Sequence, residues 1–113
     1  IWGDGSAAFS LAEFDTFVRH KIPVIALVGT DASWAQIERE QSEIFNDEVG
    51  TNLRRTDYHI VTEGYGGKGF LLKKGDDIPA VLRQAKETAK SGIPVLINAQ
   101  IGKTDFRKGS ISM

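Results

Sequence analysis

The sequence predicts an α/β fold, an open and mostly parallel sheet with helices on both faces. Two apolar runs, residues 22–28 and 94–99, show no polar alternation, which is typical of strands that are covered on both sides. Amphipathic segments at helical spacing lie between the strand-like runs. Because a strand, a crossover helix and a second strand almost always form a right-handed unit, the strands are expected to be parallel.

The first strand–helix–strand unit precedes residue 31. Ile1 and Trp2 resemble the end of a strand, residues 9–20 an amphipathic helix and residues 22–28 the next strand. A helix of that length rises about 18 Å and the strand extends about 20 Å, so the helix is long enough to return the chain to the start of the next parallel strand. The inward face of the helix is expected to carry Leu11, Phe14 and Val18.

A short helix is expected after Asp31. Ser33 is predicted to be its N-cap, with Gln36 completing a capping box three residues later. Trp34 is either a core anchor or part of a wall beside a cofactor or substrate. Residues 46–54 combine charge and glycine with few apolar side chains, so we expect a mobile loop there.

The glycine-rich stretch at residues 64–69 fits the pattern G-x-G-x-x-G. The dinucleotide-binding fingerprint needs a strand before this pattern and a helix after it. Here a helix over residues 57–64, capped by Thr56, is predicted before it and a strand at 70–72 after it. We therefore expect a helix end and a tight entry to a strand, without a nucleotide site.

The last predicted helix begins after Asp76 or Asp77, either of which can act as its cap. Pro79 is tolerated in the first turn. A buried strand over residues 94–99 follows this helix. The apolar face of the helix is expected to consist of Ile78, Val81, Leu82, Ala85 and Ala89.

Composition narrows the function classes. The chain has 113 residues, enough for one domain, with 14 basic and 15 acidic residues and a net charge of -1, so there is no electrostatic case for nucleic-acid binding. It has no cysteine, which excludes a disulfide scaffold. Since no apolar run approaches the roughly 20 residues of a membrane helix, we expect a soluble fragment. The chain begins at a strand end without Met, which suggests a piece of a longer protein.

Two carboxylates follow the first two strands. Asp4 and Asp31 each come just after a strand, and parallel strands end at one edge of the sheet, about 4.8 Å apart between neighbours. Ligands of open α/β sheets bind at this edge. Two converging carboxylates repel each other unless a cation lies between them, and oxygen ligands favour Mg²⁺ or Ca²⁺.

A phosphate group fits beside such a cation. Mg²⁺ usually shares its coordination with phosphate oxygens and water, and Gly5 and Ser6 open a helix whose free N–H groups favour an anion. The residues therefore suggest a magnesium-bridged phosphate. The alternative is structural, because Gly-Asp-Gly is a common turn and Asp a common helix cap.

Gly3-Asp4-Gly5, followed by Asp31 at the end of the next strand, resembles the cofactor signature of thiamine diphosphate enzymes. Pro23 stands where acetolactate synthases commonly have a proline. The resemblance implies that Asp4, Asp31 and the carbonyl of Ser33 hold Mg²⁺, which anchors the diphosphate of the cofactor. Asp31 replaces the family's usual Asn, so it keeps an oxygen ligand and adds a negative charge. The complete cofactor-binding set implied is Gly3, Asp4, Gly5, Ser6, Asp31, Ser33 and Trp34.

The resemblance extends over nearly the whole chain. The patterns at 64–69 and 92–97 resemble the end of acetolactate-synthase-like enzymes, and those at 13–21 and 104–107 resemble the animal members regarded as 2-hydroxyacyl-CoA lyases. Residues 1–113 would then be the C-terminal part of a thiamine diphosphate-binding domain, without the upstream domains. The intact enzyme would be a lyase or transferase that cleaves or forms a carbon–carbon bond in a 2-hydroxyacyl-CoA or 2-keto acid substrate.

The same resemblance implies that the cofactor lies between subunits of a homo-oligomer. The glutamate that activates it would come from another domain on a neighbouring subunit, so the fragment alone is expected to be inactive. In the animal proteins an upstream anchor places the enzyme at the endoplasmic reticulum membrane; the other locations implied are cytoplasmic and mitochondrial.

Two alternatives remain open at this stage. One is a scaffold of the same fold whose site has decayed, for which the Asn-to-Asp difference leaves room. The other is a Mg²⁺-binding receiver-like signalling domain. Such a domain usually has adjacent acids after its first strand and a Lys at the end of its last strand, whereas here Asp4 stands alone and Lys103 follows the last strand too late.

Overall fold

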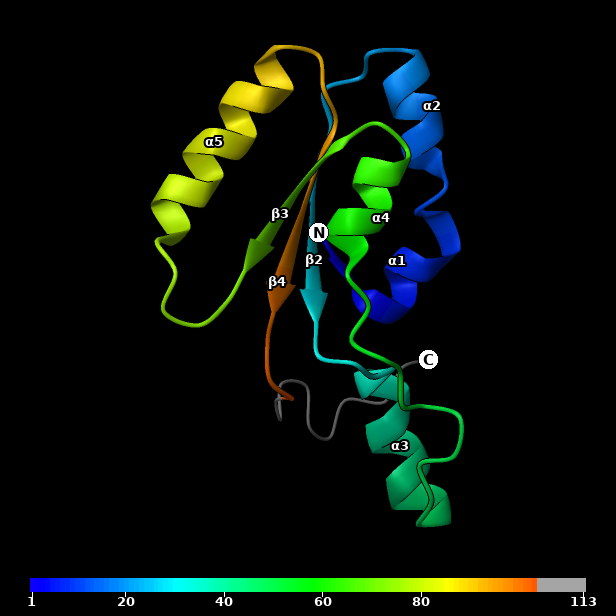
Figure 1. Cartoon of the computed structure of the whole chain (residues 1–113). Coiled ribbons are helices and arrows are strands. Elements are labelled where there is room, and N and C mark those ends of the chain that lie inside the picture. The colour runs from blue at the N-terminus through cyan, green and yellow to red at the C-terminus, as the bar shows by residue number, and fades with distance from the viewer. Residues whose placement is uncertain (104–113) are drawn as a thin grey trace.

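The computed structural model describes residues 1–103, which form a four-stranded parallel sheet with helices on both faces (Figure 1). The predicted α/β fold class is confirmed. In chain order the elements are β1 (Trp2–Gly3), α1 (Asp4–Ser10), α2 (Glu13–Arg19), β2 (Ile25–Thr30), α3 (Ala35–Phe45), α4 (Tyr58–Gly64), β3 (Lys68–Leu72), α5 (Ile78–Lys90) and β4 (Val95–Gln100).

The strand order is β1-β2-β4-β3. The two strands with the longest apolar runs, β2 and β4, lie in the centre, and they pair in register from Ile25 opposite Val95 to Thr30 opposite Gln100. The first four residues of β4 are all buried, as expected for a strand that is covered on both faces.

Each face of the sheet has its own core. On one face, Phe14 of α2 and Tyr58 of α4 pack with Leu96; on the other, α5 packs through Ala85 and Ala89. Successive residues of β4 alternate between the two cores because strand side chains alternate between the faces. Helix α3 lies beyond the carboxyl ends of β2 and β4 and covers neither face (Figure 1), and none of its residues is buried.

The helix predicted over residues 9–20 is two helices. The first begins at Asp4, and the chain tightens between α1 and α2, where the N–H groups of Phe14 and Asp15 donate to carbonyls only three residues earlier. Such i to i−3 bonds narrow the helix and end its regular course. The strand predicted at 22–28 begins later, at Ile25, because Pro23 has no N–H to donate to the sheet.

Three details of helix capping and exposure differ from the sequence analysis. Trp34 is the N-cap of α3 and Asp57 that of α4, each without a side-chain cap bond, so the caps predicted at Ser33 and Thr56 are wrong. Asp77 does cap α5, accepting from the N–H of Ala80 at 3.0 Å. On α5, the side chains of Ile78 and Leu82 are exposed rather than buried, because the helix approaches the sheet through its alanines near the edge strand β3.

The glycine pattern at 64–69 runs from the last residue of α4 to the start of β3, so a helix precedes it and a strand follows it, as predicted. Gly66 has φ of +93°, which favours glycine in this turn. A Cβ on Gly69 would come within 2.2 Å of the carbonyl oxygen of His59. These glycines therefore serve a tight turn and close packing of α4 on β3.

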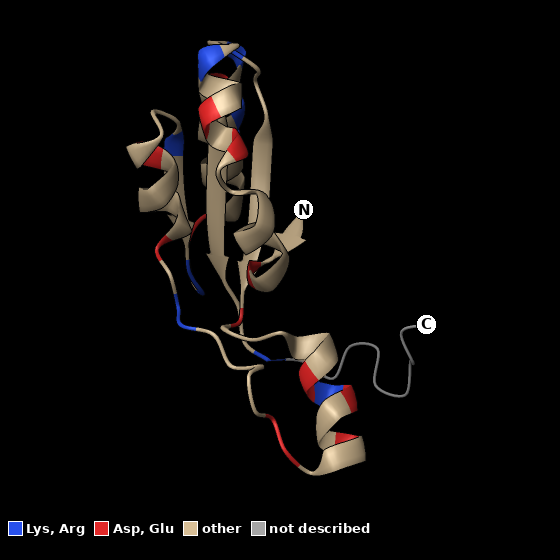
Figure 2. Ribbon diagram, turned by 90° about the vertical axis from the view of Figure 1, so that its right-hand side faces the viewer, with Lys and Arg blue, Asp and Glu red and all other residues tan. Residues whose placement is uncertain are grey.

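Within residues 1–103, no helix has the length and apolar character needed to cross a bilayer. Acidic residues recur along α3 (Figure 2), where Glu38, Glu40 and Glu43 stand against the single basic residue Arg39. The sequence pattern at 104–107 lies outside the described residues.

Candidate functional site

The carboxyl ends of β1 and β2 bring the predicted site residues together. Trp2 and Gly3 pair with Val28 and Gly29, so the turns that follow the two strands lie next to each other. A cavity of about 860 Å³ opens there. All seven residues predicted to bind cofactor line it: Gly3, Asp4, Gly5, Ser6, Asp31, Ser33 and Trp34.

Asp4 is the first residue of α1 and is 1% exposed. One carboxylate oxygen accepts the N–H of Ala32 at 2.9 Å and the other that of Gly5 at 3.1 Å. Burial raises the pKa of Asp4 above its usual value, and the negative charge of Asp31 raises it further, against the lowering effect of the two N–H groups. The two N–H groups stabilise the ionised Asp4 carboxylate only in part, so a nearby positive charge would stabilise it further.

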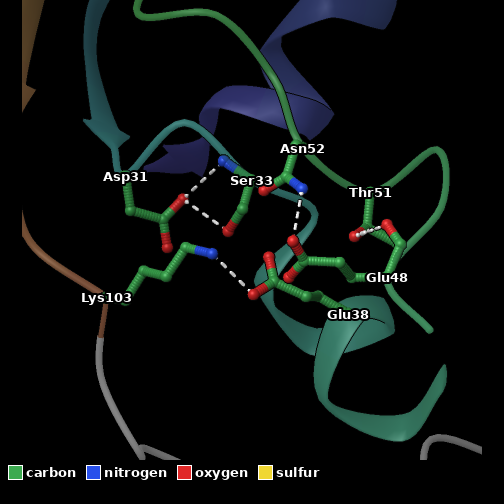
Figure 3. Close-up of polar contacts among 7 residues, drawn as sticks. All are labelled: Asp31, Ser33, Glu38, Glu48, Thr51, Asn52 and Lys103. Atoms are coloured by element: carbon green, nitrogen blue, oxygen red, sulfur yellow. Dashed lines mark hydrogen bonds and ion pairs between the residues drawn. The ribbon is translucent and has the colours of Figure 1, made fainter. Parts of the chain in front are cut away.

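Asp31 lies on the turn that leaves β2. One of its oxygens accepts both the N–H of Ser33 at 3.2 Å and the hydroxyl of Ser33 at 3.3 Å (Figure 3). This explains why Ser33 does not cap α3, since its hydroxyl is already bonded to Asp31. Both Ser33 bonds go to the same Asp31 oxygen, so the second oxygen takes no part in this contact.

The direction of the Ser33 carbonyl follows from the way residues 32–34 pair with residues 51–53. Ser33 and Asn52 form an antiparallel bridge in which the bonds are made by their neighbours, Leu53 N–H to Ala32 at 2.8 Å and Trp34 N–H to Thr51 at 2.8 Å. In such a pair the N–H and C=O of the central residues point away from the partner segment. The Ser33 carbonyl is therefore directed away from residues 51–53.

Ala32 adopts the left-handed conformation, with φ of +63°. A residue with a Cβ pays roughly 1–2 kcal/mol for that conformation. In this conformation the Ala32 N–H donates to the Asp4 carboxylate, and this bond joins the two turns that carry Asp4 and Asp31.

Gly5 and Trp34 form one wall of the cavity. A Cβ on Gly5 would lie 2.7 Å from two atoms of the Trp34 ring, whereas one on Gly3 would meet nothing within 4 Å. The ring also contacts Phe9, with centroids 5.6 Å apart. Trp34 thus lines the cavity, and a place beside a cofactor or substrate stays a prediction.

The donor set suits a hard divalent cation. Within residues 1–103, no three acidic or histidine side chains converge as a metal site, so a cation here would need the two carboxylates, a main-chain carbonyl and further oxygens from a ligand or water. That sharing is usual for Mg²⁺ with phosphate groups. The residues present therefore fit a Mg²⁺-bound diphosphate.

The sequence did not predict the charged side chains around the turn that carries Asp31. Lys103 forms an ion pair of 2.6 Å with Glu38 of α3 (Figure 3), and the negative charges of Glu38, Glu48 and Asp31 raise the pKa of Lys103. Arg55 donates to the carbonyls of Thr30 and Ile101. No local pattern could have revealed these contacts, because the partners lie 25 to 65 positions apart.

The buried pair Thr30 and Asn98 was also missed. The Thr30 hydroxyl donates to the Asn98 side-chain carbonyl at 2.5 Å, and the Asn98 amide donates to the carbonyl of Thr56 at 3.2 Å. This network ties the end of β2, directly before Asp31, to β4 and to the segment that enters α4. A polar residue inside an apolar run is the one signal that pointed to it.

Comparison with known proteins identifies the family of the chain. Residues 1–99 match the family model of the thiamine pyrophosphate enzyme, C-terminal TPP binding domain. The chain is 51% identical over 115 residues to 2-hydroxyacyl-CoA lyase 2 of Danio rerio and 50% identical to that of Homo sapiens, in each case over 100% of this chain and 18% of the relative. It is 36% identical over 100 residues to the acetolactate synthase large subunit IlvG of Mycobacterium tuberculosis, over 87% of this chain and 18% of that protein.

Solved structures share the fold. Benzoylformate decarboxylase from Polynucleobacter necessarius superposes with a TM-score of 0.77 and 21% identity, over 90% of this chain and 19% of that chain. The thiamine diphosphate-dependent 4-hydroxybenzoylformate decarboxylase of Rhodococcus jostii RHA1 gives a TM-score of 0.74 and 23% identity, over 91% and 19%. The family match replaces the receiver-like alternative: this chain belongs to the thiamine pyrophosphate (thiamine diphosphate) enzymes, in the family of their C-terminal TPP-binding domains.

Proposed function

We propose that this chain holds Mg²⁺ and the diphosphate of thiamine diphosphate for an enzyme that cleaves or forms carbon–carbon bonds. Asp4, Asp31 and the carbonyl of Ser33 would bind the metal, and Gly3, Gly5 and Ser6 would approach the diphosphate. When bound, thiamine diphosphate supplies a nucleophilic carbon and an electron sink. The chain would be the C-terminal part of the cofactor-binding domain of a longer protein, since it spans 18% of its curated relatives.

The observation that carries the proposal is the buried carboxylate of Asp4. It is 1% exposed, its pKa is raised by burial, and Asp31 adds a second negative charge nearby. The charge of Asp4 also acts on the core: the pKa of the buried Tyr58 is raised by burial and, in addition, by the negative charge of Asp4. Such a group is costly unless it is paired with a cation, and the cavity beside it has room for one.

The relatives support the substrate class. Animal proteins that are 47–51% identical over the whole chain are named 2-hydroxyacyl-CoA lyase 2. We therefore propose a 2-hydroxyacyl-CoA substrate for the full-length protein, with acetolactate-synthase-like chemistry on a 2-keto acid as the second candidate. We further propose that the full-length enzyme is a homo-oligomer and that residues 1–113 alone turn over no substrate.

The test is calorimetric titration of the full-length protein with thiamine diphosphate, with and without Mg²⁺. We expect binding that depends on Mg²⁺ and is lost in Asp4→Ala. The matched control is Asp57→Ala, which removes an exposed aspartate that makes no side-chain cap bond. Absence of binding in the unmodified protein would refute the proposal and favour the decayed scaffold.

A further inference from the structure

Residues 51–55 run antiparallel to residues 30–34, the turn that carries Asp31. Two main-chain bonds of 2.8 Å join the segments, from Trp34 to Thr51 and from Leu53 to Ala32. Thr51 is itself 3% exposed. The last part of the predicted mobile loop, residues 51–53, is thus held to this turn by main-chain hydrogen bonds.

Arg55 completes this contact with its side chain. One guanidinium nitrogen donates to the carbonyl of Thr30 at 2.9 Å and the other to the carbonyl of Ile101 at 3.1 Å. Thr30 is the last residue of β2 and Ile101 follows the end of β4. A planar fork with two parallel donors suits two neighbouring carbonyls, whereas a lysine ammonium offers a single point of attachment.

The position of these carbonyls matters for the direction of Asp31. Thr30 immediately precedes Asp31, and the next residue, Ala32, is held in a left-handed conformation. A non-glycine residue in that conformation costs free energy and persists where surrounding contacts hold the chain. Asp4 fixes the turn through the Ala32 N–H, and Arg55 fixes the strand end before it.

We propose that Arg55 is a positioning residue for the metal site: its fork joins the carboxyl ends of β2 and β4 and so sets the direction of Asp31 toward the cation. This inference rests on the proposed function, because it concerns the same Mg²⁺ ligands. Arg55 does not itself touch the cation or the cofactor in this role; it acts through the main chain of Thr30.

The chain offers a matched control in the preceding residue. Arg54 carries the same charge and is exposed, and its side chain makes no hydrogen bond or ion pair with residues 1–103. Removing either positive charge near the site should, through space alone, strengthen cation binding. A positioning role predicts the opposite sign for Arg55, so the two effects are distinguished by their direction.

The experiment is calorimetric titration of Mg²⁺ into the full-length protein saturated with thiamine diphosphate. We expect Arg55→Met to weaken Mg²⁺ binding about tenfold, as for the loss of two modest hydrogen bonds, and Arg54→Met to change it less than about twofold. Arg55→Lys keeps the charge and one donor, so it should weaken binding about threefold and provides the test if Arg55→Met does not fold. Thermal unfolding without metal separates the Mg²⁺ effect from a general loss of stability.

Equal affinities for the Arg55 and Arg54 variants, or tighter binding by either Arg55 variant, would overturn the positioning role. That result is distinct from failure of the proposed function, in which the unmodified protein itself would show no Mg²⁺-dependent cofactor binding.

Discussion

The contact between Gly5 and Trp34 allows a stringent test of the site. In Gly5→Ala the new methyl group would lie 2.7 Å from two atoms of the Trp34 ring. Carbon atoms prefer separations of about 3.5 Å or more, so the ring must shift by about 0.8 Å. The ring also contacts Phe9, which is 83% exposed and can yield. The clash should therefore cost about 1–2 kcal/mol, in the lower part of the range for overpacking.

A double-mutant cycle isolates this cost. Replacing glycine by alanine within a helix can itself add up to about 1 kcal/mol of stability, which partly hides the clash in the single variant. In a Trp34→Leu background the ring is absent, so Gly5→Ala should be neutral or stabilising. We expect a coupling of about 1–2 kcal/mol between the two positions, measured by urea unfolding followed by circular dichroism. If Gly5→Ala has the same effect in both backgrounds, the close approach of residue 5 to the ring is not what requires glycine.

Three further predictions concern the glycine pattern, the strained turn and the buried carboxylate. Gly69→Ala should cost about 3 kcal/mol, the upper part of the overpacking range, because the main chain of His59 cannot yield. Gly64→Ala meets open space and should be neutral or slightly stabilising in the same urea unfolding. Equal effects of the two substitutions would contradict the packing role of Gly69. Ala32→Val should lower the free energy of unfolding by about 2 kcal/mol or more, because a β-branched side chain tolerates positive φ poorly. Ala32→Gly should change it by less than about 0.5 kcal/mol, since relief of strain offsets the greater freedom of the unfolded chain. Because the folded-state pKa of Asp4 is raised, its contribution to stability is present below the usual aspartate pKa and is lost as pH rises through the raised value. The metal-free protein should therefore lose stability relative to Asp4→Asn between acidic and neutral pH in thermal unfolding; a difference independent of pH would refute this.

Much of the fold followed from the sequence because it depends on local patterns. The apolar runs at 22–28 and 94–99 predicted central strands, and the parallel arrangement then placed Asp4 and Asp31 at one edge. The helix break before Phe14 was not predictable, because the apolar spacing continues through it while the hydrogen bonding tightens.

The groups around the site were less predictable. A Ser three residues before a Gln reads as a helix cap, but Ser33 is bonded to Asp31. Arg55 looks like one of two surface arginines, and only the return of β4 beside β2 supplies its second carbonyl. Such contacts join segments that are distant in the chain, and single-sequence patterns carry no information about them.

The bond from Ala32 to Asp4 has a consequence for how the site could be observed. Its amide hydrogen lies between two turns separated by 28 positions in the chain, so it is shielded from solvent only while both turns are in place. Its exchange rate therefore measures local opening of the two turns together, and its chemical shift responds to the charge on the carboxylate that it contacts. The Ala32 amide resonance thus reports in solution both whether the two turns are in contact and whether the Asp4 carboxylate is charged.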